Sequence, residues 1–200
     1  MHWADFTAQR LAQRGDKHII ASGITPSGEF HIGHLREILT GDMVTRACKD
    51  AGMDAEFVFI VDSADPLRKV YPFLSDEYEK YIGCPLALIP APDEDGNPSD
   101  SGISYAQYFL DPFLKALEQI DVRPRIIDNY ESYSNGKFAE RARIVCENPD
   151  KIREIIERVS GRELSDNWFP FNPYGHNGSL DGVTVTGFEW PYVHWEQNGK

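Results

Sequence analysis

The spacing of apolar and polar residues along the 200-residue chain changes near Trp168. Before that point, some stretches place an apolar residue every three or four positions, while others are short continuous apolar runs. These two patterns are typical of helices and of buried strands, respectively. They predict helices at residues 3–15, 32–50, 105–119 and 138–160, and strands at residues 17–21, 55–61 and 125–128.

The helical stripes also predict which side chains face the core. The expected buried positions are Trp3, Phe6 and Leu11 in the first helix, Ile32, Leu35 and Leu39 in the second, and Phe109, Phe113 and Leu117 in the third. Gly15 and Ser160-Gly161 are stop signals for the first and last helices, and Asn148-Pro149 is a candidate break within the last one.

The order of these elements is strand, helix, strand, helix, strand. This order predicts an α/β fold in which parallel strands form one mononucleotide-binding half of a Rossmann-like sheet. The run at residues 55–61 is nearly all apolar, as expected of a parallel strand that is covered on both faces. We expect this half-domain to occupy residues 1–133.

Two other segments have a different character. Residues 72–103 contain five prolines and an acidic run, which predicts a mobile surface loop region with one short helix near Tyr71–Tyr81. In the tail, Val183, Val185, Trp190, Tyr192 and His194 alternate at period two, which predicts a small antiparallel β-rich segment. We therefore expect residues 134–200 to form a helix and the start of a β-rich insertion.

The stretch Ser22–His34 carries the strongest chemical signal. It joins a strand to a helix through small residues, including Gly23, Pro26 and Gly28. Free N–H groups and the positive end of the helix dipole make such a junction suitable for phosphate. We expect Ser27 and Gly28 to offer a hydroxyl and an N–H to phosphate, because glycine lets a ligand approach the backbone.

Two histidines stand at the start of the following helix. His31 and His34 are three residues apart, so they share one helix face, and Gly33 between them leaves room for a flat ring or a phosphate. Imidazole donors at a positive helix end suit the charge that develops on a transferring phosphoryl group. The pattern His-x-Gly-His is weak alone, but its position after the strand and small-residue loop predicts a nucleotide site.

Polar residues also follow the second predicted strand. Asp62 lies where ligands bind in open α/β sheets, at the carboxyl end of a strand, but a carboxylate that caps a turn has the same sequence signature. Two interpretations are also open for Arg68 and Lys69. They could contact a phosphate or tRNA, or they could belong to a solvated charged loop without a ligand.

These motifs resemble those of class I lysyl-tRNA synthetases. His31-Ile32-Gly33-His34 is similar to the ATP-binding signature of class I aminoacyl-tRNA synthetases, and the wider stretch Ser22–Glu37 resembles the lysine enzymes more closely. The opening Met1–Asp5 and the run Asp62–Val70 match the same family. The resemblance extends from Met1 to about Glu157.

The resemblance implies ATP-dependent activation of L-lysine and its attachment to tRNA(Lys), with Mg²⁺ accompanying ATP. It implies catalytic roles for His31 and His34, an ATP site formed by Pro26, Ser27, Gly28, His31, Gly33 and His34, and an amino acid pocket lined by Gly23 and Thr25. It identifies no residue that reads the lysine ammonium group, for which Glu29 and Asp62 are candidates.

Composition places limits on this interpretation. A formal net charge of −12 is unfavourable for binding tRNA phosphates, so either the acidity serves solubility or the main tRNA surface lies outside this chain. Three widely spaced cysteines favour reduced thiols over a disulfide framework or a zinc ribbon. His176 and His194 without a cysteine pair favour packed histidines over a metal site.

No signal-peptide pattern and no apolar run of about 18 residues are present, so we expect a cytoplasmic protein without a membrane partner. The hairpin signal Asn198-Gly199 stands at the end of the sequence, where no returning strand follows it. The family resemblance also implies a Lys-Met-Ser-Lys-Ser-like loop, which this sequence lacks. Together these observations predict a fragment that is inactive in isolation. Two alternatives stay open: another His-x-Gly-His enzyme, such as a glutamyl-type synthetase or a small nucleotidyltransferase, and a non-catalytic nucleotide-binding module.

Overall fold

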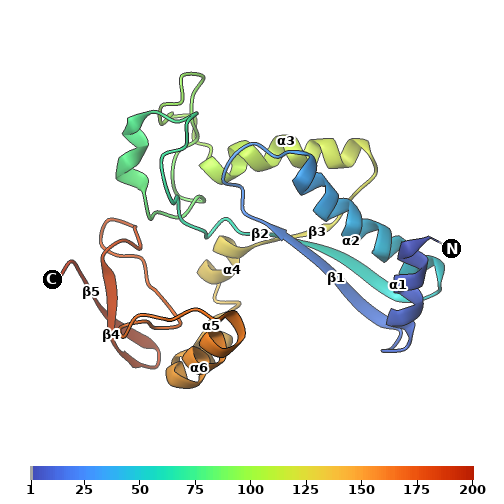
Figure 1. Ribbon diagram of the computed structural model, residues 1–200. Coiled ribbons are helices and arrows are strands. Elements are labelled where there is room, and N and C mark those ends of the chain that lie inside the picture. The colour runs from blue at the N-terminus through green and yellow to red at the C-terminus, as the bar shows by residue number, and fades with distance from the viewer. Residues whose placement is uncertain (1) are drawn as a thin grey trace.

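The computed structural model describes residues 2–200, and Figure 1 shows its arrangement. The elements in chain order are α1 (Trp3–Ala12), β1 (Lys17–Ile24), α2 (Ile32–Asp50), β2 (Asp54–Val61), the 3₁₀ helix η1 (Asp76–Tyr81), α3 (Tyr105–Gln119), β3 (Arg125–Asp128), α4 (Asn129–Ser134), α5 (Ala139–Cys146), α6 (Pro149–Ser160), β4 (Val183–Glu189) and β5 (Tyr192–Gln197).

The sheet confirms the expected α/β class. Its three strands are parallel in the order β1-β2-β3, and β1 and β2 pair from Lys17 with Asp54 to Ile24 with Val61. The main core lies between this sheet and the helices α2 and α3, where Phe59, Ile38 and Leu117 are almost completely buried. The carboxyl ends of the strands therefore meet at one edge, where the loops after β1 and β2 begin.

Helices cover only one face of the sheet in the described part of the chain. Figure 1 shows α1, α2 and α3 on the same side, and Ile19, which points to the other side, is 64% exposed. Ile19 belongs to the edge strand β1, whereas on the same face of the central strand β2 Val58 is only 2% exposed and Ile60 is half-buried, so β2 is largely covered on both faces as expected.

Two predicted apolar stripes are wrong in detail. In α1 the small residues Ala4 and Ala8 face α2, while Trp3 and Phe6 are exposed. In α2 the predicted Leu35 and Leu39 do pack against the core, beside the buried Ile38, whereas Ile32 is 79% exposed because it stands in the first turn, beyond the edge of the core. Close packing of α1 against α2 selects small side chains, which a search for large apolar anchors misses.

Residues 63–106 form a second core instead of the expected surface loop region. Buried side chains from this excursion pack against the start of α3; they include Leu67, Leu74, Tyr78, Cys84, Leu86, Ile89 and Tyr105. The predicted short helix is present as η1. Four of the five prolines (Pro85, Pro90, Pro92 and Pro98) stand in isolated β-bridges, and Pro85 and Pro92 are buried, so a proline-rich composition alone did not indicate exposure.

The C-terminal third contains the predicted helix break and β-hairpin. α5 ends at Cys146 and α6 begins at Pro149, while Gly161 ends α6 in the left-handed conformation. The antiparallel pair β4–β5 confirms the small β-rich segment, but Trp190 lies in the connecting turn and not in a strand. Asn198 and Gly199 both have positive φ, as the hairpin signal predicts. The proposed domain division after residue 133 stays a prediction.

The segment before the hairpin is docked on the second core by specific hydrogen bonds. Tyr174 donates its hydroxyl to the Ala64 carbonyl over 3.0 Å, and the buried Ser179 donates to the Ile82 carbonyl over 2.9 Å. The Leu180 N–H donates to the Gly83 carbonyl. These bonds hold the segment from Pro170 to Leu180 beside the carboxyl ends of β2 and β3.

Candidate functional site

The loop between β1 and α2 is held from both sides. The buried Tyr105 of α3 donates its hydroxyl to the Ser27 carbonyl over 2.7 Å. The side chain of Pro26 is completely buried, so this residue shapes the loop from within. A Cβ on Gly28 would lie 3.4 Å from the ring of Phe73, which packs against the loop. The loop backbone is therefore fixed before any ligand arrives.

The two histidines cap the first turn of α2 reciprocally. His31 is the N-cap residue; its Nδ1 accepts the Gly33 N–H over 3.0 Å, and Nδ1 of His34 accepts the His31 N–H over 3.0 Å. A ring nitrogen that accepts an N–H carries no proton itself, so each neutral ring has its proton on Nε2. The ring centroids are 4.0 Å apart. The cap thus presents two Nε2–H donors side by side at the positive end of a 19-residue helix.

Gly33 has a structural role that the sequence did not reveal. A Cβ at this position would lie 2.8 Å from Cε1 of His31. The space that we expected to be left for a ligand is filled by the histidine ring, which folds over the first turn. Glycine is therefore required for the cap itself.

Both burial and the neighbouring His31 lower the pKa of His34 below its ordinary value. The first cause penalises a charged ring out of water, and the second adds repulsion between two imidazolium ions. Both causes favour the neutral ring, which is the form that can accept the His31 N–H.

A second polar cluster lies at the carboxyl ends of β2 and β3. Asp62 accepts the side-chain amide of Asn129 over 3.1 Å. Next to it, the buried Ser63 donates to Asp128 over 2.7 Å, which ties the two strand ends together. Asp62 is not in an ion pair within residues 2–200, so its negative charge is uncompensated by a neighbouring cation.

Asp65 links this cluster to the loop after β1. It accepts the Thr25 hydroxyl over 3.0 Å and the Arg68 guanidinium over 3.2 Å. Arg68 is thus engaged by a carboxylate, although 72% of its side chain is exposed. Lys69 lies 5.5 Å from the ring centroid of Tyr71. Thr25 and Asp62 come close together through this network, while Lys69 lies apart from it.

The strand ends and the docked segment enclose a cavity of about 520 Å³. Asp62, Asp65 and Asn129 line it from the sheet, and Tyr174 lines it from the segment before the hairpin. Burial, together with nearby tyrosines and aspartates, raises the pKa of Tyr174 to about 12, so its hydroxyl remains a donor at neutral pH. The cavity combines an apolar wall with an excess of negative charge from Asp62 and Asp65.

Sequence reasoning found Asp62 but missed Asp65, Asn129 and Tyr174. Asn129 directly follows a predicted strand, so the rule that identified Asp62 also applies to it. Tyr174 is 110 residues away from its hydrogen-bond partner Ala64, and no local pattern signals such a contact.

Residues 2–200 contain no group of three or more His, Cys, Asp or Glu side chains that could hold a metal ion. His176 packs on the ring of Trp195 with a centroid distance of 4.8 Å. No helix in the same residues is long and apolar enough to cross a membrane.

A parallel α/β sheet whose first strand leads through a small-residue loop into a histidine-capped helix defines a Rossmann-like fold. The chain belongs to the class I tRNA synthetases: the family model described as "tRNA synthetases class I (K)" matches residues 1–200. The resemblance noted in the motifs is therefore confirmed.

Individual relatives agree with this family. The chain is 43% identical over 197 residues to a lysine–tRNA ligase of Archaeoglobus fulgidus, which covers 98% of this chain and 39% of that protein. It is 42% identical over 190 residues to the lysine–tRNA ligase of Methanosarcina barkeri, and the match covers 94% of this chain and 34% of that protein. It is 39% identical over 197 residues to the lysine–tRNA ligase of Picrophilus torridus, and the match covers 98% of this chain and 37% of that protein. The chain thus spans between a third and two fifths of these relatives' length.

Proposed function

We propose that this chain forms the ATP-binding part of the catalytic domain of a lysine–tRNA ligase. The observation that carries the proposal is the reciprocal histidine cap, which uses both Nδ1 atoms as acceptors and so leaves Nε2–H as the donor of each ring at the start of α2. The reaction activates L-lysine with ATP and then transfers the lysyl group to tRNA(Lys).

In the proposed activation step, a lysine carboxylate oxygen attacks the α-phosphorus of ATP. A new O–P bond forms, the bond to the bridging oxygen breaks, and pyrophosphate leaves with that electron pair. His31 and His34 donate hydrogen bonds to phosphate oxygens whose negative charge grows in the transition state. They act as donors and not as nucleophiles, because each Nδ1 is already occupied by a backbone N–H.

Magnesium accompanies ATP in such reactions. The described residues contain no ready-made cluster for it. We therefore propose that Mg²⁺ is held chiefly by the phosphates of ATP, as is common for this ion, and that the chain supplies neutral donors to the remaining oxygens.

We propose that the acidic cavity at the strand ends receives the lysine side chain. Asp62 has no neighbouring cation among residues 2–200, so a ligand ammonium group would compensate its charge. Gly23 and Thr25 would line the same region by family resemblance. In support, Thr25 is joined to the cavity residue Asp65 by a hydrogen bond, and Gly23 is exposed at the end of β1.

The tRNA would be bound mainly by other parts of a longer protein. Acidic residues outnumber basic ones by 32 to 20 in this chain, which disfavours a large phosphate-binding surface. Arg68 and Lys69 stay candidates for a local contact, since both side chains are exposed. A cytoplasmic location is the corresponding proposal for a protein that serves translation.

A thermal-shift comparison of lysyl and glutamyl adenylate analogues tests this function, because a ligand that binds only the folded state raises the melting temperature. We expect a larger shift with the lysyl analogue. Asp62→Asn should weaken binding of the lysyl analogue roughly 10- to 100-fold, which corresponds to the free energy of a hydrogen bond to a charged group. Asp100→Asn, in an exposed loop, is the matched control. Equal shifts would contradict lysine recognition by these residues, and no shift would contradict the ATP site.

A further inference from the structure

Two carboxylates line the acidic cavity, and they differ in their partners. Asp62 accepts the Asn129 amide on Oδ1 and has no ion pair within residues 2–200. Asp65 accepts both the Thr25 hydroxyl, at 3.0 Å, and the Arg68 guanidinium, at 3.2 Å, on the same oxygen, Oδ2. In the described part of the chain, each carboxylate therefore keeps one oxygen without a hydrogen-bond donor.

The ion pair between Arg68 and Asp65 is a weak contact. It consists of one hydrogen bond, 72% of the Arg68 side chain is exposed, and the guanidinium makes no other hydrogen bond within residues 2–200. By contrast, Arg125 engages both oxygens of Glu56, at 2.6 and 3.0 Å, which is the stronger two-bond geometry. An exposed pair with a single bond contributes little, because solvent screens the charges and the long side chain loses freedom. Arg68 can therefore leave Asp65 easily.

Asp65 itself is anchored independently of Arg68. Its backbone carbonyl accepts the Leu86 N–H over 3.0 Å, and its own N–H donates to the Asp62 carbonyl over 3.3 Å. The Thr25 hydroxyl holds the side chain, of which only 26% is exposed. The carboxylate thus stays at the cavity when the guanidinium departs.

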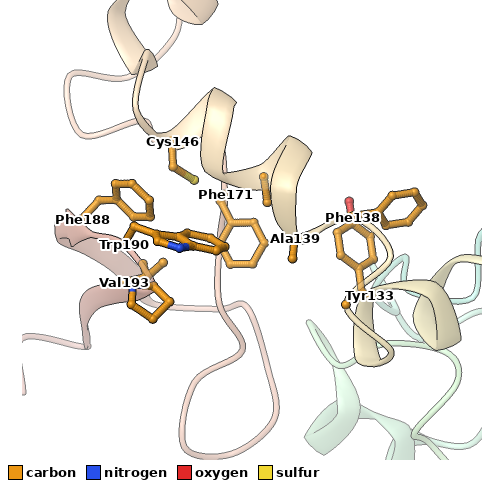
Figure 2. Close-up of a pocket in the computed structure, with 11 residues that line it drawn as sticks. Tyr133, Phe138, Ala139, Cys146, Phe171, Phe188, Trp190 and Val193 are labelled. Carbon is orange, nitrogen blue, oxygen red and sulfur yellow. The ribbon is translucent and has the colours of Figure 1, made fainter.

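The rest of the cavity wall supplies no positive charge. The cavity lining within residues 2–200 includes no lysine or arginine. Tyr133 and Phe171 line both this cavity and a second, apolar pocket of about 210 Å³, where Figure 2 shows Phe171 beside Trp190. The lining of that second pocket, in the same residues, has no charged side chain either. Arg68 is therefore the one cation that pairs with Asp65 in the described chain.

The charges of the cavity match those of the proposed substrate. Lysine carries two ammonium groups, one on Cα and one at the end of its side chain, while its carboxylate is the group that reacts. One ammonium group compensates Asp62. The second finds Asp65 as the remaining lining carboxylate, and an ammonium ion has three donors for the oxygens there. It must compete for that carboxylate with Arg68.

We infer that Arg68 is a displaceable counter-ion, which pairs with Asp65 until an ammonium group of lysine takes its place. The inference rests on the proposed function and gives Asp65 a part in selecting a substrate with two ammonium groups. An amino acid with a single ammonium group leaves one of the two carboxylates as it was. Since Arg68 is a competitor and not a contact of the substrate, removing its charge should strengthen lysine binding.

The test measures KM for lysine in the lysine-dependent exchange of pyrophosphate into ATP, using the full-length protein. Arg68→Gln should lower this KM roughly two- to fivefold, the change that corresponds to an exposed ion pair, and should leave kcat nearly unchanged. Arg68→Lys keeps the charge and should stay close to the wild type. Arg123→Gln is the matched control, because it breaks an equally exposed pair with Asp121 at the other end of β3. It should leave KM unchanged.

A repulsion between Arg68 and the ammonium group that acts through space would also lower KM. Asp65→Asn separates the two explanations, since it keeps an acceptor for the Thr25 hydroxyl but removes the charge that holds Arg68. Asp65→Asn should raise KM for lysine, and adding Arg68→Gln to it should then have no further effect.

Two results would overturn the inference and leave the proposed function intact. One is a KM that Arg68→Gln raises or leaves unchanged in a protein that activates lysine. The other is a KM that Arg68→Gln still lowers when Asp65 is already replaced by asparagine. A wild-type protein that does not activate lysine would instead overturn the proposed function.

Discussion

At the scale of single residues, the site depends on which nitrogen of each histidine carries a proton. Both Nδ1 atoms are fixed as acceptors by backbone N–H groups, and this places the proton of each neutral ring on Nε2. The sequence predicted the pair and its helix position. It did not predict the cap, because the same spacing is compatible with two rings that point freely to solvent.

This tautomer makes the start of α2 sensitive to pH. The pKa of His34 is lowered in the folded protein, so the unfolded chain binds more protons near the ordinary histidine pKa of about 6.5. The free energy of unfolding should therefore fall as the pH drops below about 6.5 and continue to fall until the pH passes the folded-state pKa. Melting temperatures measured between pH 5 and pH 8 test this expectation.

His34→Asn provides the comparison, since Asn Oδ1 can accept the His31 N–H but does not titrate in this range. The variant should lose part of the acid sensitivity of the wild type. Identical pH profiles for the two proteins would show that His34 makes no contribution to it.

At the scale of elements, Gly33 connects the helix cap to the site. A Cβ there would collide with the ring of His31, so Gly33→Ala should displace that ring and break the capping bond. Lost caps typically cost about 0.5–2 kcal/mol. We expect a destabilisation of that size in urea unfolding, together with weaker ATP binding.

Thr40→Ala in the exposed middle of the same helix controls for a general effect of alanine. It should leave the stability within about 0.5 kcal/mol of the wild type. If Gly33→Ala were as stable as this control and bound ATP normally, the close approach of the His31 ring would be irrelevant to the site.

Elements were predictable where local chemistry and burial agreed. Residues 105–119 form a helix because Ser104 and Gln107 make a capping box and Phe109, Phe113 and Leu117 face the core. The sequence ended the first strand at residue 21 because Ser22 and Gly23 resemble a loop. Pairing with Phe59 and Ile60 continues the strand through them. The short helix α4 was missed because six residues are too few to show a helical period.

At the scale of the whole molecule, function depends on contacts between distant parts of the chain. The acidic cavity exists only because the segment from Pro170 to Leu180 closes over the strand ends. The motif around residues 62–70 identified part of the sheet side of this cavity. Its other wall could not be predicted, since it arises from single long-range hydrogen bonds and not from a repeating pattern.

Tyr174 is the residue through which this closure can be tested. Tyr174→Phe keeps the ring but removes the donor to the Ala64 carbonyl, at a cost of about 1 kcal/mol. Since Tyr174 belongs to the cavity wall and not to the histidine cap, the affinity for a lysyl adenylate analogue should fall several-fold while that for ATP stays unchanged. Tyr192→Phe, at an exposed hairpin position, should change neither affinity. A parallel loss of both affinities in Tyr174→Phe would mean that the docked segment supports the nucleotide loop as well, so that the two sites form one cooperative unit.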